Sequence, residues 1–382
     1  MRGSLIKNHG KYFLVVDVGI DPETKKRKQK WINTGTNNKK AAEDLMPSLM
    51  QQIVTGQYIE PTDQTVKEYL DEWLEVAKGK VRPGTYDTYV WSVNSICKVI
   101  GLIELKKLRP MDIQKYYQKK LSQGLSPTSV RYHHRVLFMA YRQAVKWQLI
   151  QHNPCEAVDP PKKAEFEAPI LDAEQVLKML DHFRLTVYYL PILMAISTGM
   201  RRGEVCGLRW EDVDIEKKML TIKNTLETRD KKPSLGPVKT KKSQRKVRIP
   251  SDLLALLKRE KVRYAENKLR NGETFNDLGY VWCWEDGRSR SPDHLTHKFQ
   301  EGMAEAELPV IRFHDLRHTF ATLMLQEGID LKTISEQLGH ATQYFTSDVY
   351  GHVTDPMRNK VSATVDRITR KKAPKKENIK AR

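Results

Sequence analysis

The stretch from Arg312 to Val353 constrains this chain most, because polar groups recur along it between helical patterns. It predicts a helix, a short turn, a second helix, and a loop that leads to a third short helix. His314 and Arg317 are three residues apart and share one face of the first helix, and His340 and Tyr350 follow. A cation, two imidazoles and a phenol on one helical scaffold indicate a site for an anionic substrate, with phosphate the leading candidate.

The balance of charge favours a polyanionic partner. The 382 residues include 66 Lys and Arg against 47 Asp and Glu, which gives a net charge of +19. The chain is too long for one average hydrophobic core, so two or three domains are expected. No apolar run approaches the roughly 20 residues that span a bilayer, and no signal-peptide core is evident near the N-terminus.

Four widely spaced cysteines, Cys97, Cys155, Cys206 and Cys283, form no C-x-x-C pair. A disulfide framework or a zinc site is therefore not expected, and these residues are interpreted as small buried apolar groups. The expected compartment is the reducing cytoplasm.

Residues 1–60 predict a small module of two strands and a helix. The strands are expected over Lys11–Gly19 and Lys30–Thr34, and the helix over about Lys39–Thr55. A basic β-ribbon can enter a DNA groove, although a solvated hairpin tip would carry the same charges. The DNA-binding candidates in this ribbon are Lys26, Arg27, Lys28 and Lys30.

Residues 65–155 predict a helical bundle. Thr65, followed three residues later by Glu68, forms a capping box, and Pro83-Gly84 is expected to interrupt the helical pattern. Pro127 suits the first position of the last long helix. Cations on the last helices would either line a solvated face or follow the DNA backbone. The DNA-binding candidates among them are Lys119, Lys120, Arg131 and Arg135.

A Pro-rich connector precedes residues 168–370, where helices again predominate. Asp172 can cap a helix, and a later apolar helix is expected to end at Gly199. The segments MLTI and KVRIP are expected to pair as strands of a small sheet. Residues 371–382 form a basic tail.

Three cationic positions in this part are candidates for contact with phosphate. Arg201 follows the turn that ends the apolar helix, Arg317 lies beside His314, and Lys239 lies in a basic segment where a strand pair would turn. Arginine binds phosphate through two parallel donors and stays charged at any useful pH. Any one of the three, taken alone, is more often a surface ion pair or part of a mobile basic loop.

Tyr350 is a candidate nucleophile, and composition alone does not distinguish it from Tyr344. A phenol has a pKa of about 10 and attacks poorly unless nearby cations favour its ionised form. No paired-carboxylate metal cradle or Gly-rich nucleotide loop is evident, which disfavours phosphoryl transfer driven by metal or ATP. His294 and His297 lack a third ligand and are interpreted as ordinary surface histidines.

The order of these motifs resembles the tyrosine recombinases, specifically the integrases of phages and mobile elements. STGMRRGEVCGLRWEDVD resembles the first arginine box of that family, in which Arg201 is the catalytic arginine. The box departs from many relatives only at Arg202-Gly203. KTKKSQRKVRIP resembles the hairpin that bears the catalytic lysine. Lys239 matches best, and Lys241 and Lys242 remain as alternatives and as DNA-binding candidates.

Two further boxes complete the resemblance. HDLRHTFAT matches the His-x-x-Arg box and assigns His314 and Arg317. LGHATQYFTSDVYGHV matches the last box, which assigns His340 and places the nucleophile directly before Gly-His. The resemblance therefore selects Tyr350 over Tyr344.

The resemblance implies a fold, a reaction and partners. The fold is multidomain, with an α+β arm-type DNA-binding module at 1–60, an all-α core-binding bundle at 65–155 and a mainly-α catalytic domain with a small β-sheet at 168–370. The enzyme would cut and rejoin DNA through a 3′-phosphotyrosine intermediate, for integration and excision, without ATP, metal or other cofactor. The implied partners are double-stranded DNA with core and arm sites, three further copies of the chain in a homotetramer, and an excisionase or a host DNA-bending protein. No membrane partner is implied.

The resemblance also assigns roles to the six catalytic candidates. Arg201 and Arg317 would stabilise the charge of the phosphorane, with a further hydrogen bond from His340. Lys239 would be the general acid, and His314 would either accept the proton of the nucleophile Tyr350 or position that residue.

Three rival functions are weaker. A chromosome-dimer resolving recombinase of the Xer type would lack the N-terminal basic ribbon. A non-catalytic DNA-binding regulator would be expected to have lost part of the site, yet all six catalytic candidates are present. A type IB topoisomerase uses the same chemistry, but the three-part layout and the Tyr-Gly-His ending favour recombination.

Overall fold

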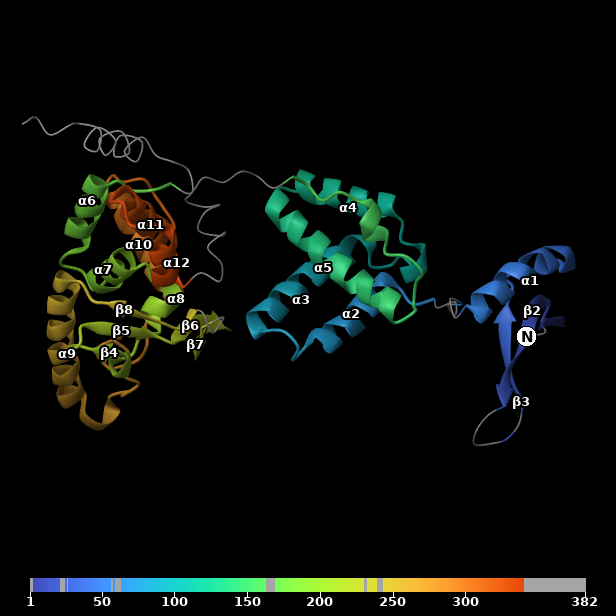
Figure 1. Cartoon of the computed structure of the whole chain (residues 1–382), viewed down its shortest axis with the longest axis horizontal. Coiled ribbons are helices and arrows are strands. Elements are labelled where there is room, and N and C mark those ends of the chain that lie inside the picture. The colour runs from blue at the N-terminus through green and yellow to red at the C-terminus, as the bar shows by residue number, and fades with distance from the viewer. Residues whose placement is uncertain are drawn as a thin grey trace, which may run out of the picture. The chain divides into compact units, whose positions relative to one another are not determined.

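The computed structural model describes residues 3–20, 25, 27–55, 58, 63–162, 169–229, 232–238 and 243–339. Its contacts divide the chain into two units, Met1–Glu165 and Phe166–Arg382. Helices dominate both units and the sheets are small, so the expected helix-rich class is confirmed (Figure 1). No helix in the described ranges combines the length and apolar character needed to cross a membrane.

A three-stranded antiparallel sheet opens the first unit. Its strands are β1 (Gly3–Asn8), β2 (Lys11–Ile20) and β3 (Arg27–Asn33), with β2 in the centre. The sequence predicted the second and third strands but missed β1. His9 and Gly10 both have positive φ, 44° and 79°, as the turn of a two-residue hairpin requires. A histidine at the first of these positions hides the turn signal that Asn-Gly would give.

Helix α1 (Lys39–Val54) covers one face of this sheet. Asn38 caps the helix by accepting backbone N–H groups of its first turn. Apolar side chains from alternate strand positions, led by Leu14, Val16 and Ile32, pack with Met46 on the helix. The small module therefore has a hydrophobic core of its own.

The bundle that follows is helical, as predicted. Thr65 and Glu68 make both hydrogen bonds of a capping box at the start of the first helix, which is confirmed. The expected interruption is present but lies at residues 78–82, directly before Pro83-Gly84, because proline is compatible with the first turn of a helix and the next one starts at Pro83 itself. Pro127 begins the last helix after its cap Ser126, as expected. The helices are α2 (Val66–Ala77), α3 (Pro83–Ile100), α4 (Pro110–Ser122) and α5 (Pro127–Lys146), with short 3-10 turns η1 (Leu105–Lys107) and η2 (Pro154–Ala157).

Helices of the second unit surround two small sheets. Asp172 caps its first helix through a capping box, as predicted. The helices are α6 (Ala173–Phe183), α7 (Tyr189–Thr198), α8 (Arg202–Cys206), α9 (Ser251–Asn271), α10 (Pro292–Glu305), α11 (Asp315–Gln326) and α12 (Leu331–Leu338), with 3-10 turns η3 (Trp210–Asp212) and η5 (Gly272–Thr274). The third short helix expected after α12 lies outside the described residues.

The larger of the two sheets contains β4 (Val213–Asp214), β5 (Met219–Ile222) and β8 (Arg245–Arg248) in that order. The predicted pairing of MLTI with KVRIP is confirmed, since Leu220 pairs with Val247 in an antiparallel register. Helix α9 runs beside this sheet (Figure 1). Its apolar side chains share a core with both strands.

A second hairpin, β6 (Asn224–Arg229) and β7 (Lys232–Pro237), lies between β5 and β8 in the sequence. The sequence did not predict it because its strands are mostly polar. Leu226 is its one side chain in the buried core among the described residues. The hairpin leads directly into the segment that carries Lys239.

A tight corner joins α7 to α8. Gly199 ends α7 with φ of 68°, a left-handed conformation that glycine adopts without steric cost. A Cβ at this position would lie 2.5 Å from Leu338 Cδ2 and 2.9 Å from Phe320 Cδ1. The corner is therefore packed directly against α11 and α12, and Arg201 follows two residues later.

Candidate active site

Arg201 begins α8 at the corner after Gly199. Its backbone N–H donates to Glu204 Oε2 at 2.9 Å, and its guanidinium Nη1 donates to Glu204 Oε1 at 2.8 Å. The Arg201 side chain is 34% exposed, whereas that of Glu204 is 2% exposed. The buried carboxylate of Glu204 thus fixes one edge of the Arg201 guanidinium. Glu204 is the one acceptor that the described residues offer to this guanidinium.

A second arginine shares the same carboxylate. Arg245 on β8 donates from Nη2 to Glu204 Oε2 at 2.9 Å and from Nη1 to Glu204 Oε1 at 3.3 Å. Burial by itself would raise the pKa of Glu204, but the hydrogen bonds and charges of Arg245 and Arg201 outweigh it and hold that pKa below its ordinary value. Glu204 is therefore ionised at neutral pH.

Arg317 lies on α11 and is buried, with only 2% of its surface exposed. Its Nη1 donates to the carbonyl oxygen of Gly199, and its Nη2 to that of Leu338, both at 2.7 Å. Both carbonyls are at helix C-termini, where the helix dipole places partial negative charge. Arg317 therefore joins the corner before Arg201 to the chain just before His340.

His314 immediately precedes α11; part of its surface reaches solvent, while the atoms around its ring still remove much of its hydration. Its ring lies 5.4 Å from the ring of His318. Loss of hydration, helped by His318 and the positive charges of Arg317 and Arg201, lowers the pKa of His314 to about 4, and Asp315 opposes this shift. The imidazole is neutral at pH 7 and can accept a proton.

The described part of the site carries excess positive charge. Arg201 and Arg245 share the single buried carboxylate of Glu204, the charges of Arg317 and Arg201 both act on His314, and His314 is neutral. The nearby Asp315 is already paired with Arg312 at 2.7 Å. Three guanidinium charges against one carboxylate leave two positive charges. A phosphate that becomes more negative in its transition state suits such a site.

The structure brings together Arg201, His314 and Arg317, three of the six predicted catalytic residues. Lys239, His340 and Tyr350 lie outside the described residues, as do Lys241 and Lys242. Their described neighbours are Val238 and Ser243, which flank the lysine segment, and Gly339, which ends α12 with φ of 65°.

Positive charge also gathers on α4 and α5 of the bundle. Burial and the charges of Lys98 and Lys119 lower the pKa of Lys120. The candidates Lys119 and Arg135 are exposed, and Arg131 Nη1 donates to the carbonyl of Pro161 at 2.8 Å. In the N-terminal sheet, Lys28 and Lys30 lie on β3 and Arg27 is its first residue, whereas Lys26 is not described.

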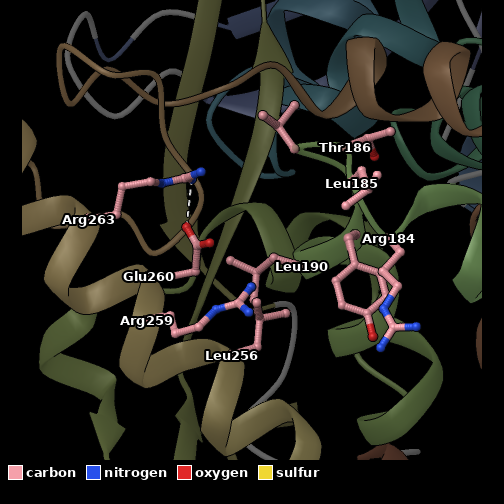
Figure 2. Close-up of a pocket in the computed structure, with 10 residues that line it drawn as sticks. Arg184, Leu185, Thr186, Leu190, Leu256, Arg259, Glu260 and Arg263 are labelled. Carbon is pink, nitrogen blue, oxygen red and sulfur yellow. Dashed lines mark ion pairs between the residues drawn. The ribbon is translucent and has the colours of Figure 1, made fainter.

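A cavity of about 270 Å³ lies elsewhere in the second unit, between α9 and the segment before α7 (Figure 2). It is lined by Arg184, Arg259 and Arg263, and Glu260 pairs with Arg263 at 2.6 Å. Among the described residues, the catalytic candidates Arg201, His314 and Arg317 do not line this cavity.

Sequence reasoning missed three residues of the site. Glu204 could have been found, because an acid three residues after Arg201 at a helix start is a capping signal. His318 is one helical turn after His314 and could have been found in the same way. Nothing in the basic segment KTKKSQRKVRIP distinguishes Arg245 from its basic neighbours.

Known protein families match most of the second unit and part of the bundle. Residues 169–357 match the phage integrase family, and residues 65–122 match the N-terminal SAM-like domain of phage integrases. The chain belongs to the phage integrase family. The resemblance to tyrosine recombinases that the order of the motifs indicates is thereby confirmed.

Two curated relatives align with this family member over nearly its whole length. One is named tyrosine recombinase XerC-like, from Caldanaerobacter subterraneus. It is 29% identical, over 96% of this chain and 98% of the relative. The other is the ICEBs1 integrase of Bacillus subtilis. It is 26% identical, over 94% of this chain and 97% of the relative.

Solved structures share the fold. The Tn1549 transposon integrase, in complex with a circular intermediate DNA, superposes with a TM-score of 0.66 at 18% identity, over 79% of this chain and 99% of that one. A lambda integrase tetramer bound to a Holliday junction gives a TM-score of 0.56 at 18% identity, over 92% of this chain and 96% of that one. The helix-rich architecture with small sheets is thus an integrase fold.

The lowered pKa of His314 predicts an imidazole that stays neutral well below pH 6.5. In an NMR titration, its ring resonances should remain unshifted between pH 7 and about 5, with His314→Gln used to assign them. Because the unfolded chain binds the proton near 6.5, this residue's contribution to stability is complete above about 6.5 and declines as the pH falls toward 4. A midpoint at or above 6.5 in the free protein would contradict this environment.

Proposed function

We propose that this chain is a site-specific DNA recombinase of a phage or integrative mobile element, which cuts and rejoins DNA to integrate and excise that element. The observation that carries the proposal is the cluster of Arg201, His314 and Arg317, with Arg201 bound to the buried Glu204, within the region that matches the family. Excess positive charge beside a neutral imidazole is what attack on a phosphodiester needs.

The proposed reaction transfers a phosphoryl group twice. The phenolic oxygen of Tyr350 attacks the scissile phosphorus, the bond from phosphorus to the 5′-oxygen breaks, and a 3′-phosphotyrosyl ester forms. His314 accepts the phenol proton, and Lys239 gives a proton to the departing 5′-oxygen. A free 5′-hydroxyl from another strand reverses these steps. Since the ester conserves the energy of the phosphodiester, religation requires no ATP.

The remaining groups act on the phosphate itself. Arg201 and Arg317 donate hydrogen bonds to its non-bridging oxygens, and His340 adds one more. Loss of one such donor or of a general acid or base costs a factor of about 10² to 10⁴ in rate. Lys241 and Lys242 are the alternatives to Lys239 as the general acid, because hairpin length varies.

Tyr350→Phe removes the proposed nucleophile and should abolish covalent attachment to a nicked suicide duplex that carries the core site. Tyr344→Phe is the matched control, since it removes a phenol six residues away from the same segment. Its cleavage should stay within about threefold of the wild type. Denaturing gel electrophoresis measures the covalent adduct. An adduct with Tyr350→Phe, or none with Tyr344→Phe, would contradict the choice of nucleophile.

We further propose a division of labour along the chain. Residues 1–60 bind arm-type DNA sites, residues 65–155 bind the core site together with the catalytic domain at 168–370, and residues 371–382 form a basic tail. The exposed cations on α4 and α5 support a backbone-contacting surface on the bundle. The basic strand β3 supports a groove-binding sheet at the N-terminus.

The proposed assembly is a homotetramer on two duplexes that exchanges strands in pairs. The lambda integrase tetramer bound to a Holliday junction supports it by likeness of fold. An excisionase or a host DNA-bending protein is proposed as the partner that sets direction. The names of the two full-length relatives point both to a XerC-like recombinase and to an element integrase. The basic N-terminal sheet favours the integrase.

Removal of residues 1–60 should separate the two proposed DNA-binding activities. The truncated chain should still form the covalent adduct on a core-site duplex, because the candidate active site lies wholly in the second unit. It should lose binding to distant arm sites in an electrophoretic mobility assay. Unchanged arm-site binding would overturn the role proposed for the N-terminal module.

A further inference from the structure

Arg245 connects three segments that are far apart in the sequence. Its side chain is only 6% exposed. The guanidinium binds both carboxylate oxygens of Glu204, donates from Nε to the carbonyl of Gln337 at 2.6 Å, and donates from Nη1 to the carbonyl of Ser243 at 3.2 Å. All three of its nitrogens are thus engaged with acceptors.

Each of these contacts reaches a different part of the proposed machinery. Glu204 holds the guanidinium of Arg201. Ser243 directly follows the segment 239–242, which carries the proposed general acid. Gln337 lies three residues before His340. Arg245 is therefore hydrogen-bonded to a residue in or near each of these three parts.

The geometry points to Arg245 as a positioning residue that sets Arg201, the lysine segment and the His340 segment relative to one another. This inference rests on the proposed recombinase function. Arg245 would not touch the phosphate, because Glu204 lies between it and Arg201. Its effect on the reaction would pass through the groups that it holds.

The chemistry of arginine explains why this residue can act as such a connection. A buried cation is costly unless it is paired, and Glu204 supplies the compensating charge. The carbonyl of Gln337 belongs to the last turn of α12, where the helix dipole adds partial negative charge. A planar guanidinium can bind a carboxylate with two donors and still donate sideways, which the single ammonium group of lysine cannot reproduce.

Arg317 makes the complementary contact on the same helix end. It binds the carbonyl of Leu338, the residue next to Gln337, and also the carbonyl of Gly199. Two buried arginines therefore bind consecutive carbonyls of α12. Arg317 also binds the corner before Arg201, and Arg245 also binds Glu204. The segment that begins at His340 would thus leave α12 from a fixed point.

The test compares Arg245→Met and Arg245→Lys with the wild type in the full-length chain. Arg290→Met and Arg290→Lys are the matched controls, because Arg290 is likewise a largely buried arginine but binds the carbonyl of Cys283 and the face of Trp284. Measurements are the melting temperature, affinity for a core-site duplex, and the single-turnover cleavage rate. Each rate is measured on an ordinary scissile phosphate and on one with a 5′-bridging sulfur, whose thiolate leaves without a general acid.

Both Arg245 variants should cleave the ordinary substrate about 10²-fold more slowly while retaining affinity for the duplex, because small misplacements of reacting groups cost rates of this order. The sulfur substrate should recover about tenfold or more of this loss, since it no longer depends on the position of the lysine. The cleavage rates of the Arg290 variants should fall by the same factor on both substrates, and only in line with any fall in melting temperature.

Equal losses on both substrates would overturn the inference, as would Arg245 variants that cleave at the wild-type rate. If Arg245→Met fails to fold, the Arg245→Lys variant decides the question by the same substrate ratio. Failure of the proposed function appears separately, as an absence of Tyr350-dependent adduct with the wild-type chain.

Discussion

The second unit depends on one buried carboxylate that two guanidinium groups share. Glu204 is almost inaccessible to solvent, yet it remains charged because Arg201 and Arg245 donate to both of its oxygens. Loss of Glu204 itself would leave the buried guanidinium of Arg245 without its compensating charge, and breaking a buried pair in this way costs about 3–5 kcal/mol. Arg201, held by Glu204 through its backbone N–H and Nη1, keeps about a third of its side chain accessible to solvent.

The packing of neighbouring helices and strands holds this arrangement rigid. Gly199 lets α7 turn sharply toward α8, and the absence of a side chain there allows Leu338 and Phe320 to pack against the corner. Arg317 fastens the same corner to the end of α12 through two backbone carbonyls. Arg245 lies on strand β8, and the pairing of β8 with β5 fixes the position of that strand. Catalysis by preorganised charge requires groups that need no rearrangement during reaction, and this packing provides them.

The structural features that depend on local sequence patterns were predicted correctly. Capping at Thr65 and Asp172, the end of α7 at Gly199 and the pairing of two short strands were correct, because each depends on neighbours in the chain or on turn chemistry. Arg201, His314 and Arg317 were found from motifs of a few residues. Arg245 could not be found, because its contact with Glu204 spans 41 residues and exists only after α8 and β8 come together. The strand β1 and the β6–β7 hairpin were missed for a related reason, since polar strands and a His-Gly turn carry weak local signals.

The proposed mechanism requires Arg201 and Arg317 to bind the scissile phosphate. A crystal structure of the chain trapped on a nicked suicide duplex would show whether they do. We expect a phosphate bonded to Tyr350 Oη, with donors of Arg201 and Arg317 within roughly 3 Å of its non-bridging oxygens and Glu204 still bridging Arg201 and Arg245. A phosphate bound by other cations, with both arginines contacting only protein, would contradict it.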